Sequence, residues 1–159
     1  MKIILATLLL PSLIIISALT ACAQDWKQIV PLKTTRAEVE RLLGPSKGAY
    51  FGDYQLKEGA LFIEYSSGPC RPNRKGGWNV PENIVVSMSF SPKHPKKLST
   101  LKLDLTKYRK VVGGDTPTVT YYINDDEGIV YAIQQGKVDY VEYGPSKKFD
   151  DLWCKDKPI

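Results

Sequence analysis

Three cysteines carry the clearest chemistry in this sequence of 159 residues: Cys22, Cys70 and Cys154. A free cysteine can act as a thiolate nucleophile, whereas a pair in an oxidising compartment forms a disulfide. Cys22 ends an apolar leader, so export processing removes it from the pool, either by lipidation or by excision. Two cysteines then remain, and their even number together with export predicts a Cys70–Cys154 disulfide between the middle of the chain and its end.

Residues 1–23 have the pattern of an export signal. Lys2 precedes an almost wholly apolar stretch, residues 3–16, which small residues follow; this is typical of a secretory leader. Two interpretations of its end stay open. Residues 19–22, Leu-Thr-Ala-Cys, resemble a bacterial lipobox and predict that Cys22 is lipidated and anchors the protein in a membrane. Residues 21–23, Ala-Cys-Ala, also fit ordinary cleavage, which predicts a free periplasmic or secreted protein. Residues 24–159 are expected to form a single domain.

Histidine and acidic residues offer the other chemical possibilities. His94 is the only histidine and lies in a basic, proline-rich loop without the carboxylate partner that a catalytic histidine needs. Asp125, Asp126 and Glu127 could supply calcium ligands, but they lack the alternating spacing of a calcium loop, so a solvated turn is favoured. The sequence contains no phosphate-binding or zinc motif. It therefore predicts no metal and no cofactor, and it favours a non-enzymatic protein.

The basic residues gather in groups, and the formal net charge is +5. One interpretation is that these groups are solvated loops that keep an exported protein soluble. The alternative is a patch for an anionic envelope component, because clustered positive charge attracts such surfaces. Export makes nucleic acid a poor partner. The candidate patch combines two of these groups, Arg71, Arg74 and Lys75 with Lys93, Lys96 and Lys97. The third group, which is not part of the candidate patch, is Lys107, Arg109 and Lys110.

One short helix is predicted at residues 36–43. Thr35 can cap its start, and Glu38 can complete a capping box. Gly44 and Pro45 then end it, because glycine adopts the left-handed conformation and proline cannot continue a helix.

Most of the remaining chain has the pattern of strands separated by turns. Residues 98–112 are ambiguous: Leu101, Leu103 and Leu105 alternate as in a strand, while the same segment also carries a helical stripe. We expect a strand to Leu105, then an irregular or helical turn. Residues 66–77 and 144–159 are expected to be a loop and a polar tail that the disulfide holds. The predicted strands are residues 49–55, 60–65, 84–90, 118–123, 129–134 and 138–143.

These elements predict an α+β fold. One short N-terminal helix is expected to pack on an antiparallel sheet, which is built from a hairpin and a C-terminal three-strand meander.

Residues 33–46 read Lys-Thr-Thr-Arg-Ala-Glu-Val-Glu-Arg-Leu-Leu-Gly-Pro-Ser and precede the expected hairpin. This segment resembles the opening of the SmpA/OmlA-like small outer-membrane lipoproteins, in which the unit assists assembly of β-barrel proteins. The whole chain is similar to uncharacterised exported bacterial proteins that share the patterns at residues 26–44 and 122–131. The resemblance implies export and a place in the cell envelope.

Together these features predict an exported, non-enzymatic bacterial envelope protein that acts as a binding or structural module. Its expected partner is an envelope protein or an anionic envelope component. The alternative function is an envelope hydrolase whose site is assembled from distant carboxylates or serines.

Overall fold

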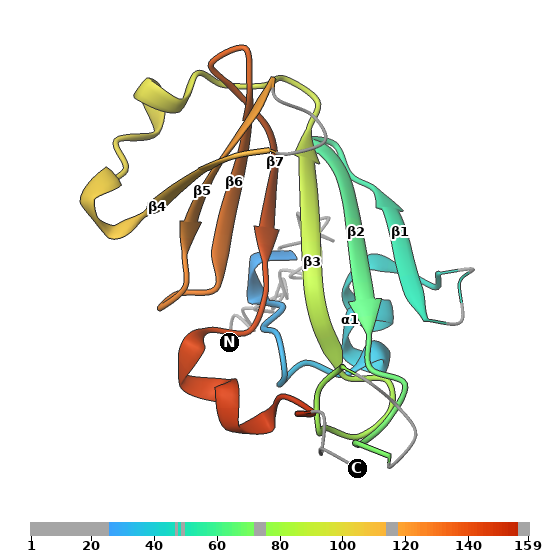
Figure 1. Cartoon of the computed structure of the whole chain (residues 1–159). Coiled ribbons are helices and arrows are strands. Elements are labelled where there is room, and N and C mark those ends of the chain that lie inside the picture. Colours follow the sequence, from blue (N-terminus) through green and yellow to red (C-terminus); the bar gives the residue numbers. More distant parts are fainter. Residues whose placement is uncertain (1–25, 47, 49, 72–75, 114–117, 156–159) are drawn as a thin grey trace, which may run out of the picture.

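The computed structural model describes residues 26–46, 48, 50–71, 76–113 and 118–155, and over these ranges it is dominated by strands. The strands are β1 (Phe51–Gln55), β2 (Gly59–Tyr65), β3 (Val85–Pro92), β4 (Arg109–Val112), β5 (Val119–Asn124), β6 (Ile129–Gln134) and β7 (Lys137–Tyr143). All seven pair antiparallel in a single sheet, in the order β1-β2-β3-β7-β6-β5-β4 (Figure 1).

The sheet consists of two meanders that meet in its middle. β1, β2 and β3 form the first, and β4, β5, β6 and β7 form the second. β3 and β7 join them, with Met88 opposite Tyr143 and Phe90 opposite Val141. The crossover between the meanders contains two 3-10 segments, η2 (Leu98–Leu101) and η3 (Leu105–Lys107). This order leaves β1 and β4 as the outermost strands.

The predicted helix is confirmed as α1 (Arg36–Leu43). The Thr35 hydroxyl accepts a hydrogen bond from the Glu38 backbone N–H at 3.2 Å, and the Glu38 carboxylate accepts one from the Thr35 N–H at 2.8 Å. Gly44 has φ +88° directly after the helix, a conformation that side chains disfavour. The helix therefore begins and ends where its local residues require.

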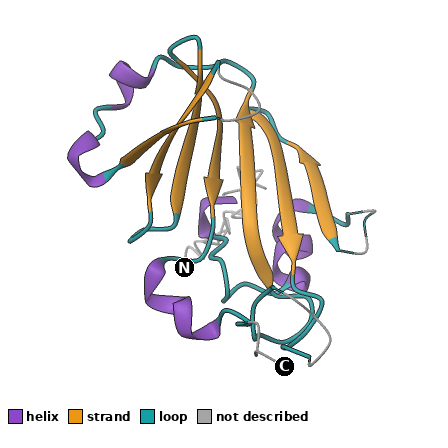
Figure 2. Ribbon diagram, viewed as in Figure 1, coloured by secondary structure: helices purple, strands orange, loops and turns teal. Residues whose placement is uncertain are grey.

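Two clusters of apolar side chains form the core on one face of the sheet. The first lies under β1, β2 and β3 and includes four fully buried side chains, Val39, Leu61, Ile63 and Val85. α1 and the 3-10 segment η1 (Trp26–Gln28) cover it, and they lie behind the strands in Figure 2. The Trp26 ring stacks on Phe90 with centroids 4.9 Å apart.

The second cluster lies under β6 and β7 and is smaller. Ile133, Val138 and Val141 are its buried members, and Leu98 and Leu101 of η2 pack against them. The second meander thus has two short 3-10 segments, η2 and η3, beside it, whereas the first meander is covered by a regular helix.

The register assigns alternate residues to the core face and to an open face, because paired residues of antiparallel strands share a face. Tyr122 pairs with Tyr131, and Tyr131 pairs with Val141, so these tyrosines lie on the core face. Tyr121 and Tyr140 both pair with Ala132 on the open face, where their hydroxyls are hydrogen-bonded. The tyrosines of the second meander therefore divide between the two faces.

The expected α+β class, one helix packed on a sheet of a hairpin and a three-strand meander, is wrong. The protein has a sheet-dominated fold in which seven strands are continuous and α1 is the single α-helix of the described residues. The strand near residues 84–90 bridges the expected hairpin and meander. β4 extends the sheet further.

The strand expected to run to Leu105 is wrong, because Leu98–Leu101 forms the 3-10 segment η2. A helical turn does follow as η3, and the strand β4 comes after it. The alternation of leucines suggested a strand, but Leu98 and Leu101 instead pack against the second cluster. A 3-10 turn places residues three apart on one side, which serves that contact.

Candidate functional site

The predicted disulfide is confirmed and organises one end of the sheet. Cys70 and Cys154 are bonded with an S–S distance of 2.02 Å and a Cα–Cα distance of 5.6 Å. Backbone hydrogen bonds reinforce the junction, from the Cys154 N–H to the Gly77 carbonyl at 2.9 Å and from the Asn79 N–H to the Leu152 carbonyl at 2.7 Å. The segment after β2 is thereby fixed to the 3-10 segment η4 (Lys147–Leu152) that follows β7.

A cleft of about 470 Å³ lies between these tied segments and the open face of the sheet. Strands β2, β3 and β7 contribute Glu64, Ser87 and Glu142, while the tied segments contribute Ser67, Trp78 and Trp153. The two indole rings meet edge to face with centroids 5.1 Å apart. Residues far apart in sequence therefore form one hollow of mixed polar and aromatic character.

Two carboxylates dominate the electrostatics of this cleft. The Ser87 hydroxyl donates a hydrogen bond to Glu64 at 3.1 Å. Burial raises the pKa of Glu142 above its ordinary value, and the nearby charge of Glu64 raises it further. No lysine or arginine lies among the described residues that line the cleft.

A second, more open cavity of about 340 Å³ continues from the cleft. The two hollows share Glu142, Gly144 and Pro145. Asp125 and Asp150 add carboxylates to the second one, and Lys147 adds one cation. Acidic groups thus extend along this end of the sheet.

Residues 125–127, considered above as calcium ligands, form the turn between β5 and β6. The Asn124 side-chain oxygen accepts a hydrogen bond from the Glu127 N–H at 3.2 Å, which closes the turn locally. The Asp125 carboxylate lies 3.5 Å from Arg109. Within the part of the chain that the structure describes, no three histidine, cysteine or acidic side chains cluster as a metal site would require.

The opposite end of the sheet carries a lysine cluster. Three connections lie together there: residues 56–58, residues 93–97, and the turn before β7. The Lys93 N–H donates to the Glu58 carbonyl at 2.7 Å, and the Val138 N–H donates to the Lys96 carbonyl at 2.8 Å. Lys97 and Lys137 form an isolated antiparallel bridge. We call the exposed side chains of these connections the lysine end: Lys57, Lys93, Lys96, Lys97 and Lys137.

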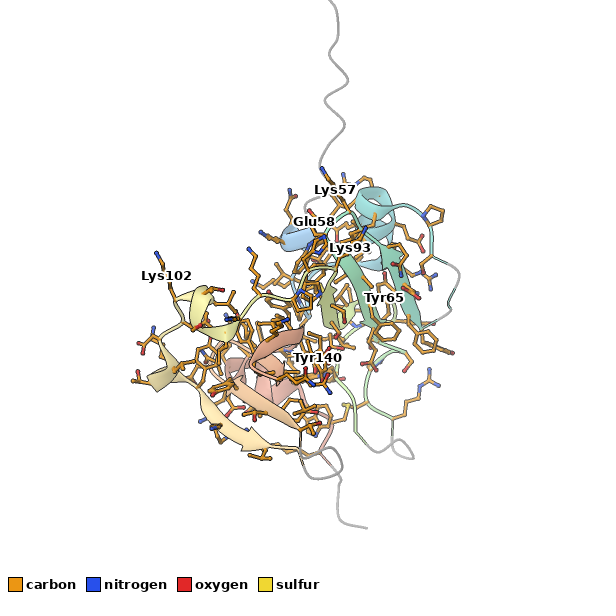
Figure 3. All side chains as sticks on the ribbon, turned by 90° about the horizontal axis from the view of Figure 1, so that it is seen from above. Lys57, Glu58, Tyr65, Lys93, Lys102 and Tyr140 are labelled. Carbon is orange, nitrogen blue, oxygen red and sulfur yellow. A yellow bond between two sulfur atoms is a disulfide. The ribbon has the colours of Figure 1, made fainter. Side chains whose placement is uncertain are left out.

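Figure 3 looks down on the lysine end and shows Lys57 and Lys93 beside each other, with Glu58 between the same connections. Lys102 projects from a separate part of the crossover. None of the five lysines forms an ion pair with the described residues. His94 is exposed in the same loop.

The structure does not bring all the predicted basic residues together. Lys93, Lys96 and Lys97 lie at the lysine end, whereas Arg71 lies beside the disulfide at the other end of the sheet. Arg74 and Lys75 fall outside the described residues, as do Cys22 and all of the predicted leader, residues 1–23. Lys107, Arg109 and Lys110 belong to η3 and β4.

Some residues of each site were not predicted from the sequence. Lys57 and Lys137 were predicted only as turn residues. Their place in the lysine end depends on the strand order, which brings the two turns together. Glu64 and Glu142 occupy polar positions in strands of alternating polarity, and nothing in the sequence marked them as members of one site. Their shared position follows only from the pairing of β3 with both β2 and β7.

Comparisons with known proteins add no relative. No protein-family model matches this chain, and no curated protein or solved structure does. Among the described residues, none of the helices has the length and apolar character needed to cross a membrane. The functional argument therefore depends on the geometry of the two ends of the sheet.

Proposed function

We propose that this protein is an exported, non-enzymatic module of the bacterial envelope that docks onto anionic lipid headgroups through its lysine end. The observation that carries the proposal is the convergence of Lys57, Lys93 and Lys137 from three separate connections that backbone hydrogen bonds hold together. The leader and the resemblance at residues 33–46 support export and an envelope role.

The energetics favour a surface contact of moderate strength. Each lysine near an anionic membrane contributes about 1 kcal/mol, and the contribution falls off within a Debye length. Because the five lysines lack ion pairs within the described chain, docking breaks no internal salt bridge. Lipidation of Cys22, which the lipobox predicts, would supply the second membrane contact that stable anchoring requires.

Vesicle co-sedimentation of the processed, oxidised chain tests this proposal. Vesicles of phosphatidylglycerol and phosphatidylcholine should bind the protein, and binding should fall as salt rises. The triple variant Lys93→Gln, Lys96→Gln and Lys97→Gln should bind ~100-fold more weakly, since three contributions of about 1 kcal/mol are lost.

The matched control removes three exposed lysines elsewhere: Lys33→Gln, Lys148→Gln and Lys155→Gln. This control has the same net charge as the triple variant and should keep nearly all of the binding. Equal loss in both variants would show that total charge, and not the lysine end, governs the interaction. Binding to an acidic polysaccharide but to no vesicle would reject the lipid partner.

The hydrolase alternative has one observation in its favour. Glu64 and Glu142 line one cleft, and burial raises the pKa of Glu142, as a general acid requires. Our proposal expects no turnover of peptide, ester or oligosaccharide substrates by the processed protein. Turnover that Glu142→Gln abolishes would assign the protein to the hydrolases.

A further inference from the structure

The crossover between the two meanders, residues 93–108, combines positive charge with apolar side chains. It contains five lysines, four leucines and one acidic residue, Asp104. All five lysines are exposed, and none forms an ion pair with the described residues. The segment begins within the lysine end, where Lys97 bridges to Lys137. Its positive charge therefore continues that of the lysine end along the chain.

The four leucines of the crossover divide into two pairs. Leu98 and Leu101 of η2 pack against the second core cluster. Leu103 and Leu105 belong to neither cluster of the described residues; Leu103 is only partly buried, and Leu105 is 44% exposed. Apolar side chains placed among lysines are typical of segments that lie in a membrane interface. The second pair is therefore a candidate for such a contact.

The backbone holds the second pair at the periphery of the molecule. Lys102 has φ +52° at the end of η2, a left-handed conformation that turns the chain towards η3. The Asp104 carboxylate accepts hydrogen bonds from the Thr106 N–H at 3.2 Å and from the Thr106 hydroxyl at 2.6 Å, and so caps η3. Figure 2 shows both 3-10 segments beside β4, on the outer side of the second meander. The crossover thus presents its unpacked leucines away from the sheet.

We propose that the crossover inserts Leu103 and Leu105 into the headgroup region of an anionic bilayer while its lysines bind the surrounding phosphates. This inference rests on the proposed function, because it extends the membrane contact of the lysine end. A bilayer complements both properties of the segment, since it is anionic at its surface and apolar beneath. Lysine stems can lie along the apolar region while their ammonium groups remain among the headgroups.

Insertion gives the membrane contact two components that salt can separate. Attraction between lysines and phosphates is screened as the salt concentration rises, whereas burial of leucine is not. Binding through the lysine end alone should therefore disappear at high salt. Binding that includes Leu103 and Leu105 should leave a residual fraction on the vesicles.

The test is vesicle co-sedimentation of the processed, oxidised protein at low salt and at about 1 M salt, where the Debye length is about 3 Å. The double variant Leu103→Ser and Leu105→Ser should bind about tenfold more weakly at low salt and lose the residual binding at high salt. The matched control is Phe62→Ser, which removes a side chain of similar exposure, 45%, from the open face of the sheet. This control should bind like the unmodified protein.

A reciprocal variant keeps the test decisive if the double variant does not fold. Leu105→Trp should bind more tightly, because indole rings favour the membrane interface. Unchanged binding in this variant and in a folded double variant would overturn the insertion. Equal weakening by Phe62→Ser would also overturn it, since the loss would not be specific to the crossover.

The remaining outcomes separate this inference from the proposed function. Vesicle binding that depends on Lys93, Lys96 and Lys97 but not on the leucines would retain the lysine end and reject the insertion. Absence of vesicle binding by the unmodified protein would reject both. A dimer that the double variant abolishes, together with unchanged vesicle binding, would assign the leucines to contact with a second copy of the chain and overturn the membrane partner.

Discussion

The two meanders share one sheet, yet they are stabilised in different ways. The first has nine buried residues in its core cluster, covered by α1 and η1. The second has three, and its cover is made by short 3-10 segments together with partly buried tyrosines. The comparison teaches that a continuous hydrogen-bonded sheet does not imply a uniform core. The depth of the core depends on what covers each half.

Tyrosines play different parts in the two meanders. In the first, Tyr54 and Tyr65 are buried, and their hydroxyls lie 3.3 Å apart, so each satisfies the other within the core. In the second, Tyr122 and Tyr131 lie at the margin of the cluster, where they are only partly buried. A partly buried ring adds apolar contact while its hydroxyl stays near water. The second meander therefore relies on amphipathic side chains.

Removing the disulfide should have the largest effect, because it links the segment after the first meander's β2 to the segment after the second meander's β7. Cys154→Ser should lower the free energy of unfolding by about 4 kcal/mol, since the bond closes a long loop in the unfolded chain. The two cysteines are 84 residues apart. Denaturant unfolding measures the change.

Chemical reduction of the unmodified protein is the control for that substitution and should give the same loss. Hydrogen exchange should show faster opening near Trp153 than in α1. An unchanged unfolding midpoint after complete reduction would contradict the role given to the bond.

A matched pair of substitutions compares the two cores directly. Ile63 in the first cluster is fully buried, and Ile133 in the second is 6% exposed. We expect Ile63→Ala to cost about 3 kcal/mol and Ile133→Ala about 2 kcal/mol, because a well-enclosed site leaves the larger cavity. Urea unfolding of both variants checks this order. Equal costs would show that the two halves are packed alike.

Hydroxyl deletions compare the covering segments. Thr35→Ala removes the capping box of α1 and should lower stability by about 1 kcal/mol. Thr100→Ala removes the hydrogen bond that the Thr100 hydroxyl of η2 donates to the Lys97 carbonyl. This bond is 2.7 Å long and exposed to solvent. It should have less than half that effect, as judged from thermal unfolding. A larger effect in η2 would reverse the assignment of the helix as the stronger cover.

The smallest expected effect is an alkaline one in the second meander. Burial raises the pKa of Tyr131 to about 12. Above the unfolded value of about 10, the unfolded chain loses this proton while the folded chain keeps it. The stabilising contribution is therefore complete below about pH 10 and declines as the pH rises towards 12. Tyr131→Phe should make this decline less steep, which the free energy of unfolding measured from pH 9 to pH 12 will show. An unaltered slope would mean that another group causes the pH dependence.

Local signals in the sequence predicted local structure well. The capping box at Thr35 and Glu38 predicts α1 with its observed bounds, and the expected export together with the even number of remaining cysteines predicts the observed disulfide. The strand order was beyond such signals, because β3 pairs with β7 across the entire second meander. Without that pairing, the sheet was assigned too few strands.

The candidate sites were less predictable than the fold for the same reason. Lys93, Lys96 and Lys97 were found because they are neighbours in sequence. Their companions Lys57 and Lys137 join them only through backbone bonds between separate connections. The cleft depends on both the strand order and the disulfide, since its walls come from the sheet and from the disulfide-tied segments. Convergence in space cannot be deduced from a composition pattern.

Within the part of the chain that the structure describes, the sheet is open, so β1 and β4 each have an edge that no further strand covers. Such edges can pair with another copy of the chain and begin aggregation. β4 has only four residues and includes Arg109 and Lys110, and β1 carries an exposed Asp53. Short length and charge are the devices by which natural sheets prevent edge-to-edge association. The same strands that complete the fold thus also protect it from polymerising with itself.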